Sequence, residues 1–176
     1  MIPSDLRMAK SEASAKENDA PGLSHLLDVN TLVALGHTLH VHHVRAERWL
    51  NSVLPTADAL ATCAITELGF VRVSVQAGLQ PDVSAARLAL AKLKASSPVP
   101  FGLWSDELGA DRLPKYVKRP AELTDGHLLE LARAHGAQFV TLDGNIPGAL
   151  LIPWTRCAFN KRPVAELANG SAKCKV

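Results

Sequence analysis

Four carboxylic acids lie where apolar segments of the chain end or begin, and together they raise the prospect of metal-dependent chemistry. They are Asp28, Glu67, Asp125 and Asp143. Carboxylate oxygens are the ligands that Mg²⁺ and Mn²⁺ prefer, and carboxylates that lie close together repel one another unless a cation neutralises them. Such cations activate water and stabilise charge on a phosphate group during transfer. If the four acids share one site, they predict attack of water on a phosphate ester.

Short apolar runs separate these acids and are expected to form buried strands. The runs are residues 25–28, 60–64, 139–143 and 149–152, with a shorter candidate at 101–104. Their apolarity is continuous rather than alternating, which is typical of strands covered on both faces. Helical periodicity lies between the runs, at residues 41–53, 81–95 and 124–135. This alternation predicts an α/β fold with a mainly parallel sheet.

The four acids are expected to meet at one edge of that sheet. Three of them follow the carboxyl ends of predicted strands, and Asp125 begins a predicted helix after Thr124. In open α/β sheets, ligands bind outside the carboxyl ends of the strands. Two neutral side chains, Asn30 and Thr141, lie two residues from an acid and are expected to support the site by orienting ligands or water.

Each acid also has a simpler structural explanation. Asp28 or Asp125 could cap a helix, and Glu67 could complement the dipole of a helix that starts near it. Asp143 precedes Gly144-Asn145, a pair of residues that is typical of turns. The convergence of all four acids favours a shared site, but it depends on the predicted strands.

Two other activities and one non-catalytic role can be weighed against the same residues. Asp28-Val29-Asn30-Thr31 is similar to the Asp-x-Asp-x-Thr motif of aspartyl-phosphate phosphatases, but Asn30 cannot serve as the general acid of that mechanism. The chain has no GxxxxGK[ST] phosphate loop, which disfavours a P-loop NTPase. The third alternative is a binding module in which the acids merely hold a structural cation.

Length and composition are those of one globular domain with two extensions. The chain has 176 residues, 47% of them hydrophobic, and a formal net charge of +2, which permits nucleic-acid binding without demanding it. We expect a flexible head at 1–22, a domain at 23–155 and a basic, partly flexible tail at 156–176. Three cysteines without metal-type spacing favour a reducing cytoplasm and no zinc site. No apolar run is long enough to span a membrane.

The order of the motifs resembles the PIN domain, and closely the VapC-type toxins of bacterial toxin–antitoxin pairs. The resemblance extends from about His25 to Pro153 and rests on LLDVNTLVALGHTLHVHHVRAERWL, ATCAITELGFVRV and LTDGHLLELARAHGAQFVTLD. The first contains Asp-x-Asn after a strand and the second Thr-Glu before an apolar helix. The third contains Thr-Asp before a Leu-rich helix and Thr-x-Asp after a late strand.

The resemblance implies a three-layer α/β/α sandwich with a five-stranded, mainly parallel sheet. It implies a ribonuclease dependent on Mg²⁺ or Mn²⁺, a cognate VapB-like antitoxin, an RNA substrate and a homodimer. Asp28, Glu67, Asp125 and Asp143 match the family's acidic quartet, and Asn30 and Thr141 match its supporting positions. By the resemblance, the three aspartates hold metal and Glu67 is a ligand or a group that orients water. Gly126 departs from the family, in which alanine is usual, and could loosen the first helical turn beneath Asp125.

Two groups of basic residues are further candidates for contacts with RNA. Arg112, Lys115, Lys118 and Arg119 surround Tyr116, which could stack on a base while the cations bind phosphates. A solvated loop is the alternative for this segment. Arg45 and Arg48 are expected on the exposed part of a helix, where they could contact substrate or antitoxin.

Overall fold

Strands and helices alternate along the part of the chain that the structure describes. A computed structural model describes residues 23–154, so the expected head (1–22) and tail (156–176) lie outside the described residues. The strands are β1 (His25–Leu27), β2 (Leu60–Cys63), β3 (Phe101–Trp104), β4 (Gln138–Thr141) and β5 (Leu150–Leu151). The helices are α1 (Val29–Gly36), α2 (His43–Val53), α3 (Ala64–Gln76), α4 (Val83–Ser96) and α5 (Leu123–Ala134), with short 3-10 turns η1 (Ala110–Arg112) and η2 (Pro120–Glu122).

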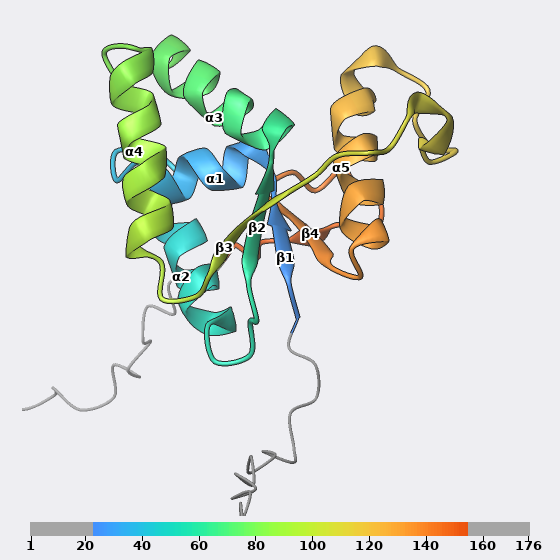
Figure 1. The fold of residues 1–176 in the computed structure, drawn as a ribbon, viewed down its shortest axis with the longest axis horizontal. Helices are drawn as coiled ribbons and strands as arrows, with labels where there is room; N and C mark the ends of the chain where they lie inside the picture. The colour runs from blue at the N-terminus through green and yellow to red at the C-terminus, as the bar shows by residue number, and fades with distance from the viewer. Residues whose placement is uncertain (1–22, 155–176) are drawn as a thin grey trace, which may run out of the picture.

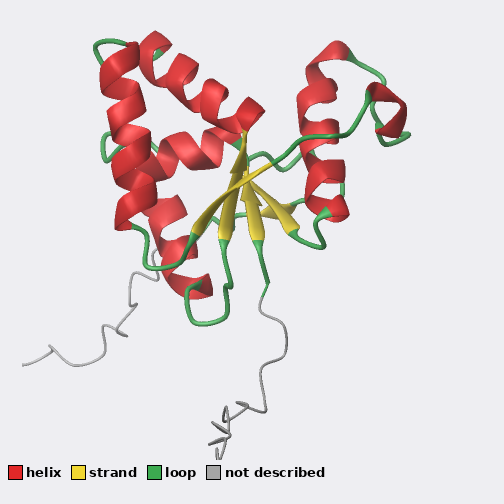
Figure 2. Ribbon diagram, in the orientation of Figure 1, coloured by secondary structure: helices red, strands yellow, loops and turns green. Residues whose placement is uncertain are grey.

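The five strands form one parallel sheet with a helical layer on each face (Figures 1 and 2). Helices α1 to α4 cover one face and α5 covers the other. Neighbouring residues of β1 point to opposite layers, because Leu27 packs in the cluster that contains α1 to α4, whereas Leu26 packs with α5. The predicted three-layer α/β/α architecture is confirmed. No helix within residues 23–154 has the length and apolarity needed to cross a membrane.

The strand order places a topological switch point between β1 and β4. The order is β3-β2-β1-β4-β5. Strands β2 and β3 therefore lie on one side of β1, and β4 and β5, which come later in the chain, lie on the other side. Leu27 pairs with Val140 across this junction. At a switch point the two connections leave in opposite directions and open a crevice at the carboxyl ends of the strands. Asp28 follows β1 directly at this point.

Two strands end earlier than their apolar runs, because helices begin there. The run 25–28 ends as a strand at Leu27, and Asp28 occupies the N-cap position of α1. The run 60–64 ends at Cys63, whose backbone N–H donates to the hydroxyl of Thr66 as α3 begins. Glu67 therefore lies in the first turn of α3.

Helix α4 confirms the helix predicted at 81–95, but its first apolar residue, Val83, lies outside the core. The carboxylate of Asp82 accepts a hydrogen bond of 2.8 Å from the backbone N–H of Ala85, so Asp82 is a true N-cap. Ala86 and Leu90 are buried, whereas the side chain of Val83 is 57% exposed. The first turn of α4 therefore lies partly outside the hydrophobic core.

The prediction that Arg45 is exposed is wrong, because its side chain is only 8% exposed. Its guanidinium donates to the carbonyl oxygens of Ile152 and Pro153, and its central carbon lies 4.3 Å from the centre of the Trp154 ring. These contacts tie the segment after β5 to α2. Arg48 is exposed on α2, as predicted.

The connection from β3 to α5 packs against the beginning of α5. The imidazole of His127 lies 2.6 Å from the carboxylate of Asp106, which joins the two segments. Gly126 is buried, and a Cβ atom at this position would lie 2.3 Å from Cγ2 of Val117 and 3.3 Å from Cδ of Pro114. The missing side chain of Gly126 thus makes room for this loop beside Asp125.

Candidate active site

Asp28 is the buried centre of the predicted acidic site. Its side chain is 4% exposed and makes no capping hydrogen bond to α1, although it occupies the N-cap position. The hydroxyl of Thr141 instead donates to Oδ2 of Asp28 over 2.9 Å. The same hydroxyl accepts a 3.0 Å hydrogen bond from the backbone N–H of Asp143, and since an N–H only donates, the hydroxyl proton is free to point at Asp28. Thr141 therefore links two of the acids across the switch point.

The three aspartates lie within one another's electrostatic field. The pKa of Asp28 is raised to about 6, mainly by burial and in smaller part by the negative charges of Asp125 and Asp143, whereas hydrogen bonds from Thr141 and from the backbone of Val29 oppose the rise. Burial and the charge of Asp143 also raise the pKa of Asp125. Asp28 follows β1, Asp143 follows β4, and Asp125 begins α5. Asp125 and Asp143 are thus near enough to Asp28, and Asp143 near enough to Asp125, for charge repulsion to act between them, and their use as one shared site stays a prediction.

Asp143 takes part in a turn and in the acidic group at the same time. Its Oδ1 atom accepts hydrogen bonds from the backbone N–H and the side-chain amide of Asn145, over 2.9 and 2.7 Å. This is the turn chemistry that the sequence Asp-Gly-Asn indicates. The two explanations offered for Asp143 are thus compatible, because the turn uses one carboxylate oxygen.

Glu67 has a partner that the sequence analysis did not identify. Its Oε1 atom accepts a 2.7 Å hydrogen bond from the hydroxyl of Thr62 and lies 2.5 Å from Nζ of Lys94. Lys94 comes from α4, 27 positions along the chain, so no local motif pairs it with Glu67. Glu67 lies in the first turn of α3, where Lys94 neutralises it at close range, whereas the charges that raise the pKa of Asp28 and Asp125 are those of other aspartates.

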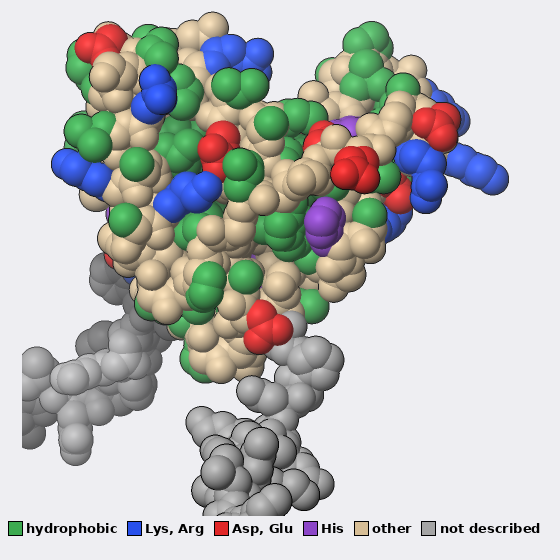
Figure 3. Space-filling view, in the orientation of Figure 1, with side chains coloured by type: hydrophobic (Ala, Val, Ile, Leu, Met, Phe, Trp, Pro, Cys, Tyr) green, Lys and Arg blue, Asp and Glu red, His purple; other side chains and the backbone are tan. Residues whose placement is uncertain are grey.

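The other predicted site residues lie farther toward solvent. Asn30 is exposed in the first turn of α1. The basic residues of the loop before α5 are exposed, and Arg119 pairs with Glu122 at 2.7 Å; these residues are Arg112, Lys115, Lys118 and Arg119. Tyr116 packs in the core cluster of α5 rather than standing free to stack on a base. Lys and Arg side chains lie at the outer end of the molecule beyond α5 and also over the α3 and α4 side (Figure 3).

The donor atoms of the acidic group suit a hydrated divalent cation. All are carboxylate oxygens, which Mg²⁺ and Mn²⁺ bind while keeping several waters. Among residues 23–154, no three His, Cys, Asp or Glu side chains stand close enough to surround one ion by themselves. A cation held by these aspartates would therefore have to keep water among its ligands.

Comparison with known families assigns the fold. Residues 25–148, which include all four acids, match the PIN domain. The chain belongs to the PIN domain family. Its relatives include ribonuclease VapC38 of Mycobacterium tuberculosis, 40% identical over 69% of this chain and 86% of the relative. Ribonuclease VapC44 of the same species is 37% identical over 70% of this chain and 92% of the relative.

A solved structure has the same PIN fold. The crystal structure of Mycobacterium tuberculosis VapC20, a Sarcin-Ricin loop cleaving toxin, superimposes with a TM-score of 0.54. The match covers 73% of this chain and 99% of VapC20 at 18% sequence identity, so it supports the fold alone. The resemblance to VapC-type toxins is thus confirmed by curated relatives, and the fold by a structure.

Proposed function

We propose that this PIN-domain protein is the toxin of a type II toxin–antitoxin pair and an endoribonuclease that requires Mg²⁺ or Mn²⁺. The observation that carries the proposal is the group of Asp28, Asp125 and Asp143 at the switch point between β1 and β4. The charges of neighbouring acids raise the pKa of both Asp28 and Asp125, and acids placed in this way are costly to keep ionised unless they bind a cation. Relatives named ribonucleases support RNA as the substrate.

In this mechanism, Asp28, Asp125 and Asp143 hold the cation, and Glu67 orients the attacking water. A divalent cation bound there supplies charge stabilisation at the phosphate and lowers the pKa of water. Thr141 keeps the Asp28 carboxylate in one orientation through its 2.9 Å hydrogen bond. Asn145 does the same for Asp143, so both carboxylates are oriented before substrate arrives. Water then attacks the RNA phosphodiester in line.

The first prediction is strict dependence of cleavage on a divalent cation. Purified protein incubated with total bacterial RNA should produce new RNA ends with Mg²⁺ or Mn²⁺, and excess chelator should stop the reaction. Adding the cation back should restore it, because the aspartates lack a nucleophile–base pair that could act without metal. Full cleavage after verified metal removal would contradict the mechanism.

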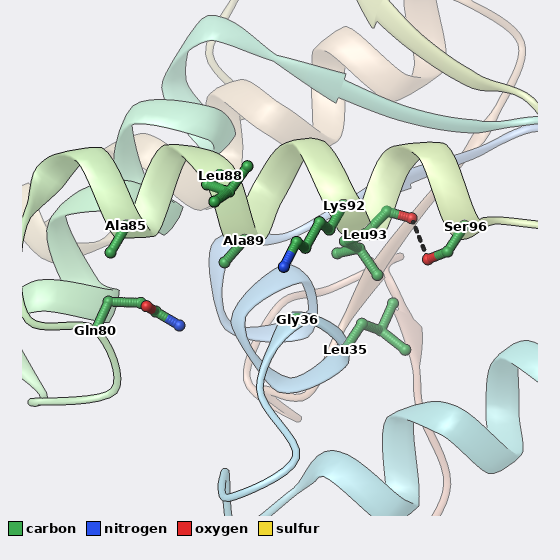
Figure 4. A pocket seen from close by; sticks show the side chains of 9 residues that line it. All are labelled: Leu35, Gly36, Gln80, Ala85, Leu88, Ala89, Lys92, Leu93 and Ser96. Carbon is green, nitrogen blue, oxygen red and sulfur yellow. Dashed lines mark hydrogen bonds between the residues drawn. The ribbon is translucent and has the colours of Figure 1, made fainter.

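The antitoxin is proposed to bind a groove of mixed polarity on the layer of α1 to α4. The groove encloses about 390 Å³ between α4 and the end of α1 (Figure 4). Ala89 and Leu93 of α4 face Leu35 and Gly36 across it. Leu88 also lines the groove and is 57% exposed. An amphipathic segment that lays its apolar face in such a groove would bury these side chains. An Arg of the same partner could reach the aspartates and pair with them.

The second prediction separates antitoxin binding from catalysis. Leu88→Glu should leave RNA cleavage unchanged and weaken inhibition by the antitoxin, encoded by the neighbouring small reading frame, by roughly 100-fold, because a buried charge opposes binding. Val83→Glu is the matched control, because Val83 lies on the same helix with the same exposed fraction of 57% but outside the groove. Copurification and growth rescue measure binding. Equal inhibition of both variants would exclude the groove.

A further inference from the structure

Glu67 is held at one carboxylate oxygen by two donors from different elements. Thr62 of β2 donates to Oε1 over 2.7 Å, and Nζ of Lys94 lies 2.5 Å from the same atom. Nζ of Lys94 also lies 3.4 Å from the Thr62 hydroxyl, which closes a three-membered arrangement. The side chains of Lys94 and Glu67 are each only 25% exposed, so this is not an ordinary surface ion pair.

The arrangement restricts Glu67 without using its second oxygen. Among the described residues, none donates a hydrogen bond to Oε2 of Glu67. The stem of Lys94 lines the groove between α3 and α4 beside Leu90 and Ala91, so its position is set by helix packing. A carboxylate held at one oxygen by a cation and a hydroxyl can still present its other oxygen to water.

We propose that Lys94 is a positioning residue that fixes Glu67 and keeps its negative charge off the aspartate group. The inference rests on the proposed function, because it concerns water and metal at that site. With Lys94 in place, the charge of the three aspartates binds the cation, and Glu67 acts as an oriented, neutralised acceptor for water. Metal affinity and cleavage rate then depend on Lys94 in opposite directions.

Removal of the Lys94 charge should therefore strengthen metal binding while slowing cleavage. In Lys94→Met, the charge of Glu67 is no longer neutralised, and Mn²⁺ should bind roughly threefold to tenfold more tightly, the effect of one unit charge near a divalent cation in a solvated site. Cleavage at saturating Mn²⁺ should fall about tenfold, because Glu67 loses its orientation. If Lys94 were only structural, its replacement would not raise Mn²⁺ affinity and lower the cleavage rate together.

The test measures Mn²⁺ affinity by titration calorimetry, melting in chelator, and cleavage of total bacterial RNA at saturating Mn²⁺. Lys94→Arg should retain most of the wild-type behaviour, whereas Lys94→Gln should resemble Lys94→Met. In a Glu67→Gln background, Lys94→Met should not slow cleavage further, because the carboxylate that it orients is gone, whereas its effect on affinity should persist because the charge of Lys94 itself acts on the cation. Arg87→Met is the matched control, since it removes one positive charge from the same groove two helical turns away.

The outcomes distinguish this inference from the proposed function. A wild-type protein that neither binds Mn²⁺ nor cuts RNA would overturn both. Wild-type binding and cleavage, with Lys94→Met unchanged in both measurements, would overturn the role of Lys94 alone. The role of Lys94 would also be overturned if Arg87→Met both strengthened Mn²⁺ binding and slowed cleavage, or if Lys94→Met slowed cleavage equally strongly in the Glu67→Gln background.

Discussion

Replacing Asp28 by asparagine should nearly abolish RNA cleavage and at the same time stabilise the metal-free protein. Cleavage should fall roughly 100-fold or more, because a metal ligand is lost at the centre of the site. The free energy of unfolding in chelator should rise by about 2 kcal/mol at pH 7.5. A pKa raised from 3.8 to about 6 sets an upper limit of about 3 kcal/mol, and the weaker hydrogen bond from Thr141 reduces the gain.

The size of the stability gain in Asp28→Asn depends on pH in a way that identifies its cause. The pKa of Asp28 is higher in the folded protein than in the unfolded chain, so the folded state retains its proton to higher pH. Stability of the wild-type protein without metal should therefore decline as pH rises from about 4 to about 6 and then level off. The stabilisation in Asp28→Asn should be small near pH 4 and complete above pH 6.5.

Asp82→Asn is the matched control, because Asp82 is the N-cap whose carboxylate does bind the backbone of its helix. Asparagine caps about as well as aspartate, so this variant should change neither stability nor cleavage. Melting curves with chelator and with millimolar Mg²⁺ should show a smaller metal-induced shift for Asp28→Asn than for wild type. If Asp28→Asn instead behaves like Asp82→Asn, Asp28 is structural.

Gly126→Ala should destabilise the protein, although alanine is the better helix former by about 1 kcal/mol. The added Cβ atom would lie 2.3 Å from Cγ2 of Val117, and the side chain of Val117 has little rotational freedom. Overpacking of this kind costs about 1–3 kcal/mol, so a net loss of about 1–2 kcal/mol is expected. Displacement of the loop beside Asp125 should also slow cleavage, by about tenfold.

Val117→Ala supplies the rescue for this variant. The double variant Gly126→Ala/Val117→Ala should be at least as stable as Val117→Ala, because truncating Val117 removes the overlapping atom. Chemical denaturation of the wild type, the two single variants and the double variant measures the coupling between positions 117 and 126. Additive effects would show that the loop moves freely around an added methyl group. The expectation that Gly126 loosens the helix would then be preferred.

The sequence by itself indicated the strands, the helices α2, α4 and α5, and the sheet edge at which Asp28 and Asp143 lie, whereas no periodicity marked α1 and α3. Strand and helix patterns repeat over a few residues, so the apolar runs and the helix that ends before Gly136, whose φ is 63°, could be predicted locally. Parallel strands end at one edge of their sheet, and this rule placed Asp28 and Asp143 together without coordinates. The boundaries were less certain, because Asp28 and Ala64 continue an apolar run but belong to helix starts.

Only the tertiary structure decided which side chains meet across elements. Lys94 reaches Glu67, and Arg45 is buried by contacts more than 100 positions away along the chain, because helix packing sets both distances. The absence of a side chain at Gly126 lets Val117 approach α5 closely, and the helix propensity of glycine does not indicate such a contact. Such partners depend on how layers are stacked, and a chain carries no local periodicity that specifies the stacking partner of a single side chain.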